Sequence, residues 1–173
     1  MKYSKQIESL LNYNATHSTK RENTMHEPMW LIYAADTTGS AITFGSITNY
    51  KSYSPLNSYR EELKIINKQI SGECGIYAAN LIVNVPRDGV SVQFFSAFCA
   101  KTALGSVIVT EVVGSQTGPV TRQTIKYTTC KIEHYTNLMN SVEMSINYSA
   151  RNETYNAYSQ GTKSGSYNST FSG

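Results

Sequence analysis

The chain has 173 residues, which fits one folded domain, because a second core would leave each half marginally small. Apolar residues make up 40% of the chain and charged residues 16%, and 13 tyrosines accompany one tryptophan, a balance typical of strands and turns. The formal net charge is +3 and the basic residues are scattered, which argues against a nucleic-acid-binding surface.

Residues 1–27 are polar and mixed in charge, with a weak helical spacing of Ile7, Leu10 and Leu11. They predict an appended N-terminal arm without the apolar segment of a secretory signal. The longest apolar stretch, residues 29–35, is far shorter than the roughly 20 residues of a membrane-crossing helix. We therefore expect a protein that is made in the cytoplasm and has no membrane anchor.

The first core element is predicted after Pro28, where PMWLIYAAD reads as a short strand buried on both faces. The turn signal at 36–39 ends this strand, and residues 41–47 are expected to form its hairpin partner.

A loop is predicted over residues 48–58, where tyrosines alternate with turn-forming residues. Tyr50, Tyr53, Pro55 and Leu56 are its candidate contact residues. One interpretation is a solvated connection, which the sequence alone favours. The other is an adhesive assembly loop, because tyrosines offer a large contact area at low entropic cost.

Residues 59–70 have apolar side chains at helical spacing and predict a short helix. Residues 76–85 (IYAANLIVNV) then predict a strand, which ends at the turn formed by residues 86–89.

The strongest helix signal lies over about residues 91–103, with Ser91 as its N-terminal cap and Gly105 as its stop. The predicted core face of this short side helix consists of Val92, Phe95, Phe98 and Cys99. Its phenylalanines are interpreted as core packing, because no polar groups converge on them as they would in a ligand pocket.

The rest of the chain changes to a period near two, which predicts three consecutive antiparallel strands. The second is long, with a phase change near 128–130 that fits a bulge. In the third, the residues expected to share the inner face are Val142, Met144, Ile146, Tyr148 and Ala150. We place the folded domain at 28–158 and a Gly/Ser/Tyr-rich tail at 159–173, either frayed or an ordered extension.

No constellation of residues predicts catalysis, a metal site or a cofactor. Cys74, Cys99 and Cys130 are odd in number and lack paired spacing, so buried free thiols are expected rather than zinc ligands or disulfides. His134 sits between Glu133 and Tyr135 on a predicted strand, and neighbours on a strand point to opposite faces. The sequence therefore predicts a protein that is not an enzyme.

Four segments together carry a resemblance to a known family. They are PMWLIYAADTTG, VQFFSAFCAKTALGSVIVTEV, RQTIKYTTCKIEHYT, and SVEMSINYSARNETYNAY followed by QGTKSG. Over roughly residues 28–165 the chain resembles Hcp, the haemolysin-coregulated protein that forms the inner tube of the type VI secretion system. The resemblance implies a mainly β fold, a compact antiparallel β-barrel of two packed sheets with one short side helix.

The resemblance also implies a structural function. Six copies would form a hexameric ring, and stacked rings would form a tube that carries effectors, with sheath and spike proteins as further partners. The protein would leave the cytoplasm by this route without a cleaved signal peptide. In such a tube, residues 50–56 would lie at the contact between rings.

Two other interpretations stay open. A phage tail-tube or viral capsid protein shares the composition and would also assemble with itself. A secreted carbohydrate-binding module would use exposed tyrosines as stacking platforms, although the absence of a signal sequence argues against it.

Overall fold

The computed structural model describes residues 28–67, 74–115, 118–159 and 162–172. Its elements in chain order are β1 (Met29–Asp36), β2 (Ser54–Pro55), β3 (Ser58–Asn67), β4 (Cys74–Pro86), α2 (Gly89–Cys99), β5 (Leu104–Ser115), β6 (Gly118–Asn137), β7 (Ser141–Asn147), β8 (Ala150–Ser159) and β9 (Thr162–Ser172). The expectation of a mainly antiparallel β fold with a short side helix is confirmed.

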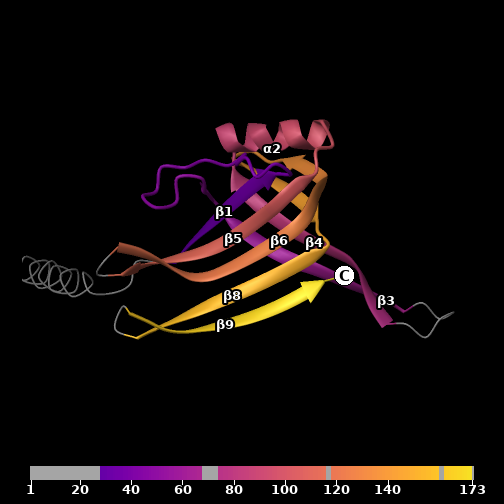
Figure 1. Cartoon of the computed structure of the whole chain (residues 1–173). Helices are drawn as coiled ribbons and strands as arrows, with labels where there is room; N and C mark the ends of the chain where they lie inside the picture. Colours follow the sequence, from indigo (N-terminus) through magenta and orange to yellow (C-terminus); the bar gives the residue numbers. More distant parts are fainter. Residues whose placement is uncertain (1–27, 68–73, 116–117, 160–161, 173) are drawn as a thin grey trace, which may run out of the picture.

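The strands form two packed layers that share β6 (Figure 1). The first part of β6 pairs with β5 and β8, and its second part, from Lys131 to Asn137, pairs with β7. Thr129, at the change of partner, has a φ of 52°. This irregularity lies where the phase change was predicted. The strand order is β2-β1-β5-β6-β7-β4-β3, with β8 and β9 branching from β6.

The sheet does not close into a barrel through backbone hydrogen bonds among the described residues. β3 pairs with β4 alone, and β1 pairs with β5 and the two-residue β2. Trp30 and Tyr59 instead bring β1 and β3 together through their rings, whose centroids lie 4.9 Å apart. The expected barrel is therefore an open one.

The core lies between the two layers. Each main strand contributes buried apolar side chains, among them Ile32, Leu81, Val109, Tyr127 and Ile146. β1 is buried on both faces as predicted, because Leu31 and Ile32 point to opposite sides and are both inaccessible to solvent. In β7, Val142, Met144 and Ile146 are buried, and Tyr148 follows them into the core. The predicted alternation therefore holds from Val142 to Tyr148, whereas Ala150 begins the next strand, β8.

The hairpin predicted between β1 and residues 41–47 is wrong. A single bridge joins Ala35 to Ala41, and the chain then leaves the strand direction. At Ala34, a side chain replaces the backbone partner that a hairpin would supply: the Thr43 hydroxyl accepts a hydrogen bond from the Ala34 backbone N–H at 2.9 Å. The loop crosses β1 instead of pairing along it, and the main partner of β1 is β5.

The helix predicted over 59–70 is also wrong for the residues described, because β3 covers 58–67. Its whole length pairs antiparallel with β4, and these ladder bonds outweigh the helical spacing of its apolar residues. Within β3, Tyr59 and Glu61 are partly buried whereas Arg60 and Glu62 are exposed, as period two requires. Residues 68–70 lie outside the described part.

Helix α2 is present, but its start and its core face differ from the prediction. Asp88 is the cap: its carboxylate accepts from the backbone N–H groups of Val90 and Ser91, and the Ser91 hydroxyl accepts from the Asp88 N–H. The helix ends at Cys99, and Gly105 belongs to β5.

The core face of α2 consists of Val90, Ser91 and Phe94, with Phe98 partly buried against the core. Val92 is 62% exposed and Phe95 46% exposed, and Cys99 is exposed as well. The prediction failed because the helix carries apolar residues on two faces, so periodicity alone does not say which one packs.

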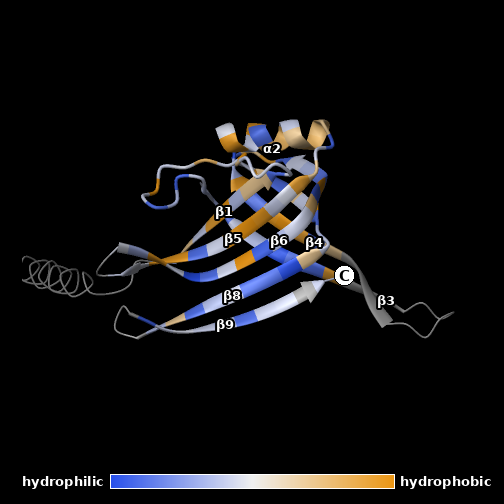
Figure 2. Ribbon diagram, in the orientation of Figure 1, coloured by the Kyte–Doolittle hydropathy of each residue, from blue (hydrophilic) through white to orange (hydrophobic). Residues whose placement is uncertain are grey.

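The strands continue past residue 158, where the sequence placed a domain boundary. β9 pairs with β8 from Ser159↔Thr162 to Ala150↔Ser172. These two strands are more hydrophilic than β5 and lie at the border of the sheet away from α2 (Figures 1 and 2).

Candidate assembly surfaces

The loop proposed for assembly is largely engaged within its own subunit. Leu56 is buried in the core, and Pro55 is an exposed residue of β2. The Tyr50 hydroxyl lies 2.7 Å from the Thr121 hydroxyl of β6, and the ring of Tyr53 packs against that of Tyr33 with centroids 5.4 Å apart. These tyrosines therefore attach the loop to the outer side of β1, β5 and β6.

The tip of this loop is the part that stays accessible. Gly45 is needed at its base, because a Cβ there would lie 2.0 Å from the carbonyl oxygen of Tyr53. Ser46, Thr48 and Asn49 are exposed, and Asn49 adopts a φ of 70° that asparagine tolerates better than most residues. A contact between copies at this loop would therefore use its tip more than its tyrosines.

Strand β9 presents an open edge. One of its edges pairs with β8, and no strand among the described residues pairs with the other. Lys163 is its single charged residue, and the strand is rich in Ser, Thr, Asn and Tyr. A long edge strand with a single charge is a template for pairing with another chain, because its unpaired N–H and C=O groups seek partners.

The other long border of the sheet is protected. β3 carries Arg60, Glu61 and Glu62 in succession, and Arg60 forms ion pairs with Glu62 and with Glu143 of β7. Charged side chains on an edge strand oppose pairing with a second sheet. The contrast makes β9 the better candidate for contact between copies.

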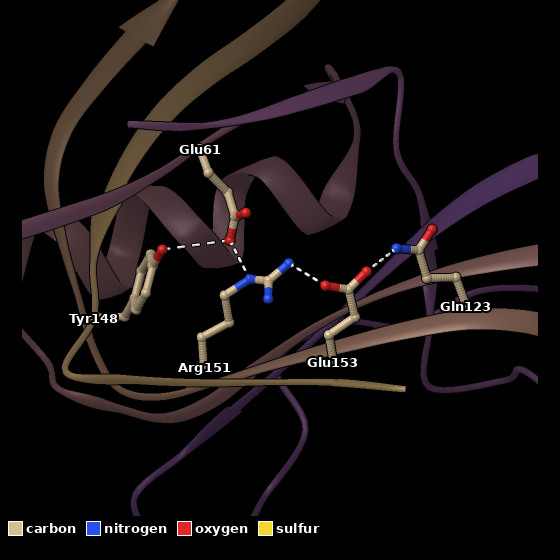
Figure 3. A network of polar contacts seen from close by, with 5 residues as sticks. All are labelled: Glu61, Gln123, Tyr148, Arg151 and Glu153. Atoms are coloured by element: carbon tan, nitrogen blue, oxygen red, sulfur yellow. Dashed lines mark hydrogen bonds and ion pairs between the residues drawn. The ribbon is translucent and has the colours of Figure 1, made fainter. Parts of the chain in front are cut away.

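A network of polar side chains joins β3 to β8 where the backbone leaves the sheet open (Figure 3). The Arg151 guanidinium donates from Nε to Glu61 at 2.8 Å and from Nη2 to Glu153 at 2.6 Å. The Tyr148 hydroxyl donates to the same Glu61 oxygen at 3.3 Å, and the Gln123 amide donates to Glu153.

The members of the network point toward the core side of the two layers. Arg151 lies opposite Tyr127 in the β6–β8 ladder and Glu61 lies opposite Leu81 in the β3–β4 ladder, and directly opposite residues share a face. Burial acts against the charge of Arg151, but its hydrogen bond to Glu153 and the negative charge of Glu61 raise its pKa overall. Burial likewise raises the pKa of the Tyr148 hydroxyl. The network therefore closes the seam with side chains.

Glu111 is a second buried acid on the same side of the sheet. It is almost fully buried, and Arg122 of β6 donates two hydrogen bonds to its carboxylate. That contact raises the pKa of Arg122. The carboxylates of Glu61 and Glu111 are thus each paired with an arginine, as charges removed from solvent require.

The exposed face of α2 is the remaining unusual surface. Val92, Phe95 and Cys99 lie on one side of the helix, next to Tyr135 of β6. Apolar side chains on the solvent side of a surface helix are candidates for contact with another chain.

Among the described residues, no group of three or more His, Cys, Asp or Glu side chains is placed to hold a metal ion. His134 is exposed on β6. Cys130 is buried as expected, and burial raises its pKa to about 12, whereas Cys99 is exposed, which corrects the expectation for that thiol.

Sequence reasoning missed three features that the structure brings together: the open edge of β9, the Arg151 network and the exposed face of α2. The network depends on contacts between residues about 90 positions apart, which no local pattern reveals. The low charge of residues 162–172 was visible in the sequence. It would have indicated an unprotected edge strand if that segment had been recognised as a strand.

Comparison with solved structures identifies the fold. The Hcp1 protein from E. coli EAEC 042 pathovar superposes with a TM-score of 0.66 at 14% identity, covering 83% of this chain and 97% of that one. Secreted protein Hcp3 from Pseudomonas aeruginosa gives 0.58 at 16% identity, covering 80% and 97%. A type VI secretion system effector from Yersinia pestis gives 0.59 at 12% identity, covering 83% and 98%. The chain therefore has the fold of Hcp proteins, as the resemblance implied.

The sequence itself has no comparable match. No protein-family model matches the chain, and no curated protein matches it. Within the described ranges, no helix combines the length and the apolar character needed to cross a membrane.

Proposed function

We propose that the protein is a structural subunit of a type VI secretion inner tube. The observation that carries this proposal is the fold, which is shared with nearly the whole length of solved Hcp proteins, including 97% of the E. coli chain. Two of these similar structures are described as a secreted protein and as a type VI secretion effector. Apolar side chains fill the core between the layers. Another protein can therefore contact this subunit only at its outer surface.

Six copies would close into a ring through contacts between unlike surfaces of neighbouring subunits. Such heterologous contacts close when the rotation per subunit divides the circle. The open edge of β9, which carries only one charged residue, supports this arrangement, because a neighbour that adds a strand there would satisfy backbone groups left open in the isolated subunit.

Stacked rings would then form a tube whose work is to hold and deliver effectors. Its partners would be further copies of itself together with sheath, spike and effector proteins. The subunit would be made in the cytoplasm and leave the cell within the machine. This role needs no catalytic group or cofactor.

The test is the assembly state of the purified full-length chain. Light scattering is expected to give the mass of a hexamer, and electron microscopy is expected to show hollow six-fold rings. A monomer that binds glycans would instead support a carbohydrate-binding module, and a stable monomer at high concentration would count against a tube subunit.

A matched pair of variants tests the β9 edge separately. Thr170→Lys places a charge on exposed β9 and is expected to prevent ring closure, whereas Thr37→Lys makes the same change in the exposed turn after β1 and is expected to leave rings intact. Equal ring formation by both variants would remove β9 from the interface without affecting the fold-based proposal.

A further inference from the structure

Beside the second half of β6, α2 is flanked by two hollows. A hollow of about 370 Å³ lies at its start, and Arg87, Val92, Phe95 and Tyr135 are among the residues that line it. Another of about 640 Å³ lies at its end, where the lining includes Phe98, Cys99, Lys101, Lys131 and Glu133. We call this surface the α2–β6 groove.

The groove has an apolar wall and an open strand edge. Val92, Phe95 and Cys99 form a stripe along α2, and the ring of Phe95 lies against Tyr135 with centroids 5.2 Å apart. β5 pairs with β6 as far as Cys130, so in the described part of the chain residues 131–137 pair with β7 alone. Apolar side chains beside an unpaired strand edge suit a short segment with two or three apolar residues.

We propose that the α2–β6 groove binds the segment around Ile7, Leu10 and Leu11 of a second copy of this chain. The segment belongs to residues 1–27, which precede the described structure, and its three apolar residues share the i, i+3, i+4 spacing that forms one stripe on a helix. The segment carries Glu8 and follows Lys5, and Lys101, Lys131 and Glu133 line the wider hollow, so both charges of the segment have opposite charges available there.

The partner is a second copy because of where residues 1–27 join the domain. Met29 pairs with Val112, at the opposite end of β1 from Asp36, which pairs with Leu104 just after α2. Seven residues of strand separate these ends by roughly 23 Å. When the segment and the groove belong to different copies, this separation gives head-to-tail contacts, as stacking requires. The inference thus rests on the proposed function.

The native Cys99 thiol in the groove provides a direct test. In the full-length Leu10→Cys variant, a mild thiol oxidant is expected to join the introduced thiol of one copy to Cys99 of the next, giving dimers and larger species on a non-reducing gel. These bands are expected to disappear when Cys99→Ser is added. Thr19→Cys, which places the thiol outside the apolar segment, is expected to crosslink far less.

A second set of variants tests the apolar wall. Adding Val92→Ser and Phe95→Ser to Leu10→Cys is expected to reduce the crosslinked fraction several-fold, and both side chains are exposed enough to be changed with little effect on folding.

Other results would overturn the inference. A monomer of altered mobility that depends on Cys99 would mean that the segment folds back onto its own subunit. No crosslink, or equal crosslinking of the Leu10 and Thr19 variants, would leave the groove without this occupant. Rings seen by electron microscopy in those same samples would keep the proposed tube function while rejecting the role of the segment.

Discussion

At the scale of single residues, α2 shows what a sequence pattern leaves undecided. Phe94, Phe95 and Phe98 all lie within one helix, and the predicted face contained two of them. The structure buries Phe94 completely and leaves Phe95 46% exposed. Periodicity alone does not choose between the two apolar faces of the helix, and the structure packs the face that carries Val90 and Phe94.

Replacing these phenylalanines separately distinguishes the two faces. Phe94→Ala is expected to lower the free energy of unfolding by about 3–5 kcal/mol, as for other buried aromatic residues. Phe95→Ala is expected to lower it by about 1 kcal/mol, because its ring contacts mainly Tyr135. Urea unfolding of the two variants measures both values. Equal losses, or a larger loss for Phe95, would reject the orientation of α2.

At the scale of elements, the strands with one clean period were predictable and the others were not. β7 alternates buried and partly exposed side chains over its whole length, and that pattern was enough to predict a strand. β3 carries Arg60, Glu61 and Glu62 together, and a strand interpretation would have had to place a charged Glu61 on the core side. Arg151, which lies 90 positions away, makes that placement stable, and sequence spacing does not reveal it.

The Arg151 network is therefore expected to stabilise the attachment of β8 and β9 to the rest of the sheet. Arg151 is 16% exposed and contacts two carboxylates, so Arg151→Gln leaves Glu61 and Glu153 without a cation and is expected to cost about 2 kcal/mol. Chemical denaturation measures this loss. Hydrogen exchange of the β8 and β9 amides is expected to become faster in the same variant.

Arg60→Gln is the matched control for this change. Arg60 also pairs with two carboxylates, but it is 56% exposed, and exposed ion pairs contribute less than about 1 kcal/mol. A similar loss of stability in the two variants would mean that the contacts across the seam add nothing beyond an ordinary surface pair.

At the scale of the whole molecule, the fold class could be predicted from the sequence more fully than the candidate assembly surfaces. Strand content, the side helix and the three consecutive strands were all predictable from composition and period. The branching of β8 and β9 from β6 was not, because one strand of 20 residues serves two layers and only the tertiary pairing shows which strands it contacts. The open edge and the α2–β6 groove both depend on that arrangement.

The same arrangement changes what the loop tyrosines are expected to do. Tyr50 contacts Thr121 and Tyr53 contacts Tyr33, so Tyr50→Ser with Tyr53→Ser is expected to lower the thermal midpoint and to release the loop from β6.

The exposed tip of the loop offers a cleaner test of ring stacking. Thr48→Lys is expected to leave single rings and stability unchanged while shortening stacks, because each repeated contact would have to bury a charge that has no partner there. Electron microscopy of ring and tube populations, beside a melting curve for each variant, separates the two effects. Full-length tubes from the Thr48 variant would exclude the loop tip from the stacking contact, whatever the tyrosine variant does.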